Sequence, residues 1–420
     1  MQGAYSAPTI DEPLHAELTI PGSKSLTNRE LIIAAIADGP GRLIAPLHSD
    51  DSARMVDALR ALGVGIQEVD AGNEFGPDLV ITPAKLHGGT TVDCGQAGTV
   101  MRFIAPLAGL AEHDVHLTAH ETALHRPMGG LISALRDLGV DIDDEGTWAL
   151  PFTIRGHGRI RGGRVEIDAS ASSQFVSGLL LAAPRFDVGL HLVHTGEHLP
   201  SLPHIDMTIE ALSRRGIRIE RPAVGEWLVE AGVPRAKEIA IEPDLSNAAP
   251  FLAAALVTGG SVSITGWPAH STQPGALATP NAMRPIRITV RAGSAIRGLD
   301  LDLSAASELT PTLVGLAAFA ESPTTFRGIG HIRLHETDRI AALIRNIRAL
   351  GGEAEELPDG LRVIPRPLRG GTWAAHHDHR MATTGALIGL RVPGVEIDDI
   401  GTTAKTLPEF TMLWERMLRG

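Results

Sequence analysis

Three times in its first 219 residues the chain repeats one pattern, ALRALGVGI at 58–66, ALRDLGVDI at 134–142 and, more loosely, ALSRRGIRI at 211–219. The copies start 76 and 77 residues apart. Each copy reads as the end of an amphipathic helix, a glycine that stops the helix, and the start of a strand. A further copy, RALGG, lies at 348–352. The pattern predicts repeated α/β units, three before residue 220 and at least one after it, divided between two domains.

The composition is that of a globular protein that is too long for a single core. At 420 residues the chain is expected to form two domains of about 200 residues each. Its formal net charge of −12 argues against nucleic acid or an anionic membrane as the main partner. No apolar run approaches the roughly 18 residues of a membrane span, and the single cysteine, Cys94, excludes a disulfide within the chain. These features favour the cytoplasm.

One segment places cations where a helix begins. The sequence PGSKSLTNR at 21–29 is followed by the apolar run LIIAAIA at 31–37, so Lys24 and Arg29 stand in the first turns of a predicted helix. Cations are disfavoured there, because the free N–H groups and the macrodipole already make that end positive. A bound phosphate or carboxylate would reverse the balance. A solvated, serine-capped helix start fits the segment equally well.

Further segments share this arrangement. The sequence GQAGTVMR at 95–102 places Gly98 and Arg102 at another helix start, although two glycines at this spacing also serve helix packing. Arg126 precedes a proline at an expected junction between a strand and a helix. The serines at 170–173 open another helix, where they either bind a phosphate or act as caps.

The basic residues at predicted helix starts come from both halves of this acidic chain. They are Lys24, Arg29, Arg102, Arg126, Arg339, Arg380 and Lys405. We interpret them as lining one cleft between two domains that binds a ligand with several negative charges. The cluster HHDH at 376–379 lacks the spacing and the supporting partners of a zinc site, so no metal is predicted.

One stretch breaks the rhythm of the repeats. Residues 275–297 occupy the place of a further helix, but Pro280 and Pro285 argue against a continuous helix there. The Leu-Gly stop signal is also missing from this stretch. We therefore expect one irregular repeat in the second half of the chain.

The motifs, in their order along the chain, resemble those of the 5-enolpyruvylshikimate-3-phosphate (EPSP) synthase family. The matching segments are 21–29, 97–102, 172–174, 336–339, 378–382 and 403–406. The resemblance implies an α/β (α+β) fold of two similar domains, each with three βαβαββ repeats in an inside-out α/β barrel, and a cleft between the domains. The N-terminal domain would span 22–240, and residues 1–21 plus 241–420 would form the C-terminal domain, including the irregular repeat at 275–297.

The reaction implied by the resemblance moves the enolpyruvyl group of phosphoenolpyruvate (PEP) to the 5-hydroxyl of shikimate 3-phosphate and releases phosphate. It belongs to the shikimate pathway of aromatic amino acid biosynthesis, and the family is the target of the PEP-site inhibitor glyphosate. The reaction needs a base for the hydroxyl, an acid for the PEP methylene and clamps for a tetrahedral intermediate. The resemblance implies no cofactor and no metal, and it favours a cytoplasmic monomer.

Roles for individual residues are carried over from the matching motifs. Shikimate 3-phosphate would contact Ser25, Arg29, Ser172, Ser173, Gln174, Ser201, Glu308 and His335. PEP and the departing phosphate would contact Lys24, Gly98, Arg126, Gln174, Arg339, Arg380 and Lys405. Glu308 is the candidate base for the 5-hydroxyl, and Glu336, with Lys24 close by, is the candidate for proton transfer at the methylene. His335 stands where many members have lysine, so a cation there would depend on pH.

Two other interpretations stay open. A related transferase acts on UDP-N-acetylglucosamine and commonly uses a cysteine on a mobile loop as proton donor, whereas Cys94 lies just before the turn at 95–99. The sequence SSQ at 172–174 also favours the shikimate enzyme. A non-catalytic, anion-binding homologue would bind shikimate 3-phosphate without releasing phosphate. The full set of candidate residues argues against such a binder.

Overall fold

The computed structural model describes residues 4–273, 286–293 and 295–420. The chain divides into two compact units, unit 1 formed by Met1–Pro21 with Glu242–Gly420, and unit 2 formed by Gly22–Ile241. Of the irregular stretch predicted at 275–297, residues 275–285 and 294 lie outside the described residues. Among the described residues, no helix is both long and apolar enough to cross a membrane.

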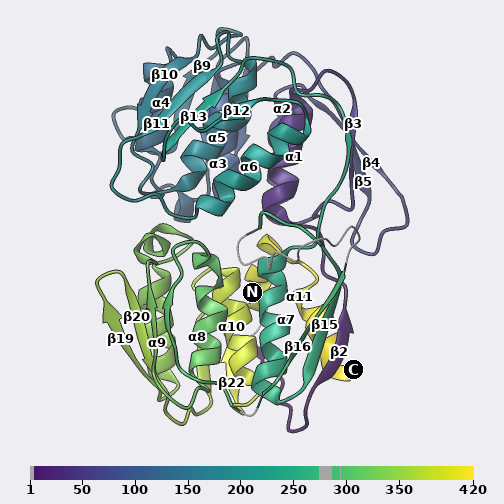
Figure 1. The fold of residues 1–420 in the computed structure, drawn as a ribbon, viewed down its shortest axis with the longest axis vertical. Coiled ribbons are helices and arrows are strands. Elements are labelled where there is room, and N and C mark those ends of the chain that lie inside the picture. The colour runs from purple at the N-terminus through teal and green to yellow at the C-terminus, as the bar shows by residue number, and fades with distance from the viewer. Residues whose placement is uncertain (1–3, 274–285, 294) are drawn as a thin grey trace. The chain divides into compact units, whose positions relative to one another are not determined.

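Unit 2 consists of three sheets and the helices that cross between their strands (Figure 1). Its helices are α1 (Lys24–Ala35), α2 (Asp50–Ala61), α3 (Gly98–Ala108), α4 (Gly129–Asp137), α5 (Ser173–Ala182) and α6 (Leu202–Arg214), with short 3₁₀ turns η1 (Glu121–Ala123) and η2 (Ala183–Arg185). Its strands are β3 (Gly41–Ile44), β4 (Gly65–Val69), β5 (Asp78–Thr82), β6 (Thr90–Asp93), β7 (Val115–Thr118), β8 (Asp141–Asp143), β9 (Phe152–Arg155), β10 (Gly163–Ile167), β11 (Leu190–His194), β12 (Ile219–Glu220), β13 (Glu226–Val229) and β14 (Glu238–Ala240).

The three sheets share one topology, with orders β14-β3-β5-β4, β6-β7-β9-β8 and β10-β11-β13-β12. In each sheet the first pair of strands is parallel and the other pairs are antiparallel. A parallel pair needs a crossover helix, whereas the last two strands of each repeat form an antiparallel pair. The predicted βαβαββ repeat is therefore confirmed in unit 2. In the first sheet, β14 from the end of the unit takes the place of the opening strand.

The glycine stops predicted from the repeated pattern are confirmed. Gly63, Gly139, Gly216 and, in unit 1, Gly351 have φ values between 86° and 102°. In each case the glycine N–H donates to the carbonyl three residues back, and the next N–H donates to the carbonyl five residues back, at 2.9–3.1 Å. This arrangement closes the helix end and needs a left-handed residue, which glycine adopts without steric cost.

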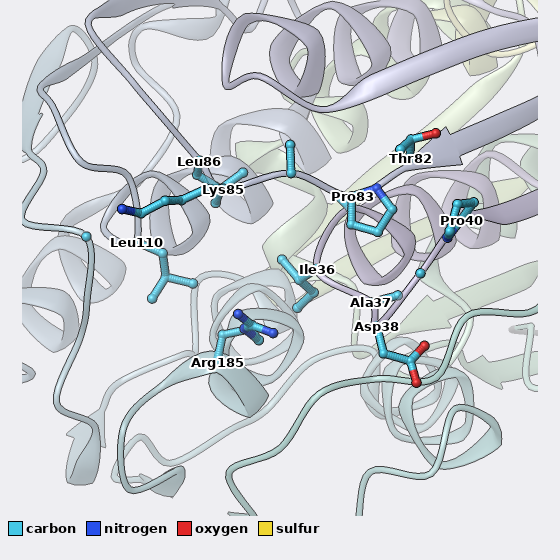
Figure 2. Close-up of a pocket in the computed structure, with 14 residues that line it drawn as sticks. Ile36, Ala37, Asp38, Pro40, Thr82, Pro83, Lys85, Leu86, Leu110 and Arg185 are labelled. Atoms are coloured by element: carbon cyan, nitrogen blue, oxygen red, sulfur yellow. The ribbon is translucent and has the colours of Figure 1, made fainter.

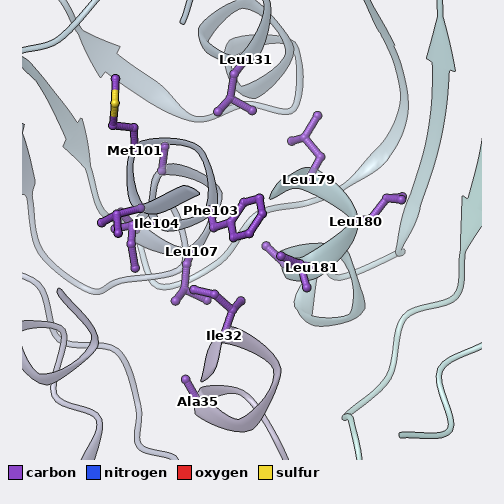
Figure 3. Packing of buried hydrophobic residues seen from close by; sticks show 14 of the residues in the cluster. Ile32, Ala35, Met101, Phe103, Ile104, Leu107, Leu131, Leu179, Leu180 and Leu181 are labelled. Atoms are coloured by element: carbon purple, nitrogen blue, oxygen red, sulfur yellow. The ribbon is translucent and has the colours of Figure 1, made fainter. Parts of the chain in front are cut away.

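The core of unit 2 is built around α1, α3 and α5, and most residues of all three helices are buried. Helices α3 and α5 are mainly apolar, whereas α1 buries the polar residues Asn28, Arg29 and Glu30 together with its apolar ones. Figure 3 shows Phe103 of α3 lying among Ile32 of α1 and Leu179 and Leu181 of α5. Phe103 is fully buried, so truncation to alanine is expected to cost about 3–5 kcal/mol of stability. The sheets lie outside these helices, as the inside-out arrangement predicts.

Unit 1 has related topology. Its helices are α7 (Leu245–Thr258), α8 (Thr310–Ala317), α9 (Arg339–Ala349), α10 (His379–Gly389) and α11 (Phe410–Arg419), with 3₁₀ turns η3 (Ser307–Leu309), η4 (Gly330–Leu334) and η5 (Ile400–Lys405). Its strands are β1 (Tyr5–Ser6), β2 (His15–Leu18), β15 (Ser261–Trp267), β16 (Ile286–Arg291), β17 (Asp300–Asp302), β18 (Thr324–Arg327), β19 (Glu353–Leu357), β20 (Gly360–Ile364), β21 (Gly371–Trp373) and β22 (Val395–Ile397).

The sheet of order β17-β18-β20-β19 repeats the topology seen in unit 2. The other two sheets of unit 1 each take a strand from the N-terminal segment. Strand β2 pairs in parallel with β15, and β1 pairs antiparallel with β22. The N-terminal segment is thus part of unit 1, although the whole of unit 2 follows it in the sequence.

Candidate functional site

Lys24 occupies the first position of α1, as predicted. Its ammonium nitrogen lies 3.0 Å from Oδ2 of Asp51, in the first turn of α2, and the side chain of Asp51 is only 4% exposed. The alternative of a serine-capped helix start is wrong, because Ser23 is buried and makes no side-chain cap bond. The first turn of α1 therefore presents a cation that a neighbouring helix holds in place.

Arg29 is a buried cation surrounded by neutral oxygens. Its Nε donates to Thr208 Oγ1 at 2.8 Å, while Nη1 and Nη2 donate to the carbonyls of Ser25 and His204 at 2.9 Å. Its guanidinium carbon lies 5.2 Å from the ring centroid of Phe103. Burial lowers the pKa of Arg29 to about 9, so the guanidinium is still charged at neutral pH. Among the described residues no carboxylate pairs with it, which suits it to binding an anion.

Gly98 stands at the first position of α3, where three polar side chains converge. Nη1 of Arg102 donates to the Gly98 carbonyl at 3.3 Å and to Oε1 of Gln174 at 3.2 Å. Nη1 of Arg126 donates to the carbonyl of Gln96 at 2.9 Å. A Cβ at residue 98 would lie 3.5 Å from both Arg126 Nη1 and Gln174 Oε1. The predicted glycine, arginines and glutamine thus form one group.

The predicted serines stand at helix starts of the same unit. Ser172 is the N-cap of α5, and its Oγ accepts a hydrogen bond of 3.3 Å from the N–H of Gln174. Ser173 is the buried first residue of α5. Ser201 precedes α6 in a left-handed conformation, with φ at 51°, and its side chain makes no cap bond. A strained residue that does not cap its helix is a candidate for ligand contact.

In unit 1 the predicted residues surround Arg339, the first residue of α9, which is 2% exposed. Its Nε and Nη2 donate to the two carboxylate oxygens of Asp378 at 2.7 and 3.2 Å, and Nη2 also donates to Oε2 of Glu336 at 2.8 Å. Its Nη1 donates to Nδ1 of His335 at 3.1 Å. Oε1 of Glu336 accepts from the ammonium of Lys405. Glu336 therefore lies between two cations.

Glu308 lies in η3, immediately before α8, and is 9% exposed. Its Oε1 is buried and has no hydrogen-bond partner among the described residues. Burial raises the pKa of its carboxyl, although Arg380 and Arg339 oppose this effect. Nη2 of Arg380 donates to Ser246 Oγ at 3.0 Å, and burial together with the nearby Arg339 lowers the pKa of Arg380. A carboxylate that is buried but not fully bonded has the properties of a base.

The structure corrects one expectation. Lys405 does not stand at a helix start but at the last position of η5, from which its ammonium reaches Glu336, 69 residues earlier in the sequence. His335 lies beside Arg339, with Nδ1 3.1 Å from Nη1, and the pH dependence expected of its charge stays a prediction.

Sequence reasoning also missed several partners of the predicted residues. These are Asp51, Thr208 and Ser246, none of which lies in a segment with a recognised motif. A pair of acidic residues at the start of α2 was the only local signal for Asp51.

A pocket of about 490 Å³ in unit 2 contains none of the predicted residues (Figure 2). Ile36 and Asp38 follow the end of α1, Leu110 follows the end of α3, and Arg185 ends the 3₁₀ turn after α5. The pocket is therefore at the C-terminal ends of helices whose N-terminal ends carry the predicted site. Among the described residues no group of three or more His, Cys, Asp or Glu side chains could hold a metal ion.

Comparison with known proteins identifies relatives over nearly the whole chain. The model of the EPSP synthase (3-phosphoshikimate 1-carboxyvinyltransferase) family matches residues 8–414. A curated protein of Kocuria rhizophila named 3-phosphoshikimate 1-carboxyvinyltransferase is 48% identical over 419 residues, which cover 97% of this chain and 94% of that protein.

Two solved structures share the fold. EPSP synthase from Acinetobacter baumannii superposes with a TM-score of 0.81 at 24% identity, over 99% of this chain and 98% of that one. The enolpyruvyl transferase NikO from Streptomyces tendae gives a TM-score of 0.74 at 18% identity, over 99% and 97%. From the family match and the Kocuria relative, we conclude that this chain belongs to the EPSP synthase family.

Proposed function

We propose that this chain is a 3-phosphoshikimate 1-carboxyvinyltransferase. It transfers the enolpyruvyl group of PEP to the 5-hydroxyl of shikimate 3-phosphate and releases phosphate, as a step of the shikimate pathway. The observation that carries this proposal is the 48% identity to the Kocuria enzyme over 97% of the chain. The candidate residues, placed as described above, are consistent with it. We expect the enzyme to act in the cytoplasm as a monomer without a cofactor.

The charges of the two substrates match the two sets of residues. Shikimate 3-phosphate carries a carboxylate, which we assign to Arg29 and Ser25, and a phosphate, which we assign to Ser172, Ser173 and Ser201. Arg29 lacks a carboxylate partner among the described residues, so the substrate would supply its missing countercharge. We also assign contacts with this substrate to Gln174, Glu308 and His335.

We assign contacts with PEP and the departing phosphate to the residues carried over from the family motifs. They are Lys24, the backbone of Gly98, Arg126, Gln174, Arg339, Arg380 and Lys405. The cations would stabilise the negative charge of the tetrahedral intermediate and of the departing phosphate. Such charges are stabilised most effectively by groups that are already fixed in place, which the ion pairs of Lys24 and Arg339 achieve.

The proton transfers are assigned to two glutamates with different surroundings. Glu308 would accept the proton of the 5-hydroxyl as that oxygen attacks carbon 2 of PEP, and its raised pKa favours this task. Glu336, in its protonated form, would deliver that proton to the methylene carbon, which becomes a methyl group in the intermediate. The same methyl group must lose a proton when the bond to phosphate breaks. Glu336 then takes the proton back, while Lys405 and Arg339 remain bonded to it.

The two alternatives are less well supported. Cys94 is fully buried, and burial raises the pKa of its thiol to about 12, which does not suit the exposed proton donor of the UDP-N-acetylglucosamine enzyme. A non-catalytic binder would not need a buried, incompletely bonded carboxylate such as Glu308.

Phosphate release by the purified protein tests the proposal. The assay would contain shikimate 3-phosphate and PEP together, and each would then be omitted in turn. Release that requires both substrates is the expected result. No release, despite thermal stabilisation by shikimate 3-phosphate, would identify a binder instead. Release with UDP-N-acetylglucosamine in place of shikimate 3-phosphate would identify the related transferase.

A further inference from the structure

Asp378 is a completely buried carboxylate with no assigned role in the reaction. It is the N-cap of α10, and its Oδ1 accepts a hydrogen bond of 2.9 Å from the backbone N–H of Arg380. The same carboxylate binds Arg339 through both oxygens, with Oδ2 at 2.7 Å from Nε and Oδ1 at 3.2 Å from Nη2. Nδ1 of His379 lies 3.7 Å from Oδ1. One side chain thus contacts both of the arginines assigned to PEP in unit 1.

The bidentate contact fixes which edge of Arg339 is available. Nε and Nη2 are engaged by Asp378 and Glu336, so among the described contacts of Arg339 only Nη1 has no carboxylate partner. In this structure Nη1 donates to the neutral ring nitrogen of His335. A phosphate or carboxylate oxygen is a stronger acceptor for a guanidinium than a neutral imidazole, so a bound anion would replace His335 there.

The cap bond fixes Arg380 in a different way. Asp378 holds the backbone of Arg380 at the second position of α10, and the Arg380 side chain donates to Ser246 Oγ, which in turn donates to Asp244 Oδ1 at 2.8 Å. Arg339 and Arg380 also repel each other. A buried negative charge that contacts both residues offsets this repulsion.

We propose that Asp378 is a positioning residue for PEP: by bridging Arg339 and the backbone of Arg380, it holds both arginines ready for an anion. The inference rests on the proposed function and extends it to a residue that does not touch the substrate itself. If Asp378 were only a helix cap, its loss would lower stability and affect both substrates alike.

The first test is the variant Asp378→Asn. The introduced amide would still be able to cap α10, since asparagine is as good an N-cap as aspartate, but it lacks the charge and the second acceptor oxygen that Arg339 needs. We expect kcat/KM for PEP to fall by about 100-fold, the loss that misplaced binding groups typically cause. The affinity for shikimate 3-phosphate should change little, whereas the melting temperature should fall, because Arg339 loses a buried carboxylate partner and keeps Glu336.

A matched control is Asp338→Asn. Asp338 is also an aspartate N-cap in unit 1, where its Oδ1 accepts from the N–H of Ala341 at 3.0 Å, but its ion-pair partner is Arg333 rather than Arg339. This variant should retain the wild-type KM for PEP. Equal KM values for PEP in the two variants would overturn the inference. So would a fall in kcat/KM in Asp378→Asn that is the same for both substrates.

A double-mutant cycle tests whether Asp378 acts through Arg339. In an Arg339→Gln background, Asp378→Asn should lower kcat/KM for PEP little further, because the arginine that Asp378 positions is already absent. If the two substitutions lowered kcat/KM for PEP independently, so that their fold-changes multiplied in the double variant, the proposal would be contradicted. If Asp378→Asn does not fold, Asp378→Ser provides the comparison, since serine caps a helix but cannot reach Arg339.

Inorganic phosphate separates failure of this inference from failure of the proposed function. Phosphate should stabilise the wild-type protein thermally, and Asp378→Asn should lose that stabilisation while Asp338→Asn keeps it. This readout does not require turnover, so it tests Asp378 even if the wild-type protein releases no phosphate from the two substrates. Equal stabilisation of both variants by phosphate would overturn the inference.

Discussion

Gly98 leaves no room for a side chain, because a Cβ built on it would lie 2.6 Å from Nη1 of Arg102. Arg102 cannot simply move away, since it is only 6% exposed and the same nitrogen donates to the Gly98 carbonyl and to Gln174. An alanine at residue 98 would therefore disturb the group of side chains assigned to PEP.

We predict that Gly98→Ala raises KM for PEP by about tenfold, which corresponds to about 1.4 kcal/mol of binding free energy. KM for shikimate 3-phosphate should change much less. Steady-state kinetics with each substrate varied in turn measures both values. Gly39→Ala is the control, because a Cβ there meets only Ala236 Cβ at an ordinary 3.7 Å. The same KM for PEP in both variants would disprove the crowding argument.

Glu308→Gln should abolish turnover and stabilise the protein at neutral pH. Burial raises the pKa of Glu308, so the folded state binds its proton more tightly than the unfolded state does. The free energy of unfolding therefore falls as pH rises from the unfolded pKa to the raised folded pKa. Above the folded pKa, the whole loss of stability is present. A glutamine cannot ionise and avoids this cost. We expect a gain of about 1 kcal/mol at neutral pH, or about 2–4 °C in melting temperature.

Melting temperatures of wild type and Glu308→Gln, measured as a function of pH, check this prediction. The difference should disappear once the pH falls below the unfolded pKa, which is near 4.5. Glu321→Gln, at an exposed position, is expected to show no difference at any pH. A variant that is less stable than wild type at neutral pH would show that the two arginines outweigh burial.

The buried ion pair of Glu30 and Arg215 is expected to stabilise unit 2 only as a complete pair. Nε and Nη2 of Arg215 lie 3.0 and 2.6 Å from Oε2 of Glu30, and both side chains are at most 2% exposed. Arg215→Met leaves the glutamate charge buried without a partner, which costs about 3–5 kcal/mol, whereas replacing both residues by methionine should be close to neutral.

Urea denaturation of the single and double variants measures the contribution of this pair. The neighbouring Arg214 pairs with Glu210 on the surface, so Arg214→Met should cost less than about 1 kcal/mol. If the double variant were as unstable as Arg215→Met, packing rather than the unpaired charge would explain the loss.

Cys94 should not react with alkylating agents in the folded protein. The thiol is fully buried and its pKa is raised to about 12, so almost no thiolate is present at neutral pH. Incubation with iodoacetamide should leave the mass and the activity unchanged, while labelling should be complete in denaturant. Rapid labelling of the native protein with loss of activity would revive the cysteine-dependent alternative.

The sequence predicted those features that depend on local signals. The glycines at 63, 139, 216 and 351 mark helix ends because only a few residues in a row decide the helix stop. The starts of α1, α3, α9 and α10 were likewise visible in short motifs. The spacing of these signals predicted repeated α/β units, whereas the βαβαββ order of the strands and helices was implied by the family resemblance.

The partners of the site residues could not be read in the same way. Arg29 meets Thr208, which is 179 residues away, and Arg380 meets Ser246, which is 134 residues away. Such contacts depend on how separate repeats pack, which no local pattern in a single sequence reports. The prediction that Lys405 stands at a helix start is wrong for the same reason, because packing sets both its ion pair with Glu336 and its position at the end of η5.

The pairing of β2 with β15 and of β1 with β22 has a consequence for synthesis on the ribosome. The N-terminal strands emerge first, but Ser261 and Val395, where their partners begin, are made hundreds of residues later. At about 5–20 residues per second, the first strand waits on the order of 20–80 s for its partner. Unit 2 is contiguous and is completed during that wait. Nascent chains should therefore contain a folded unit 2 while the first 21 residues are still unpaired and accessible to chaperones.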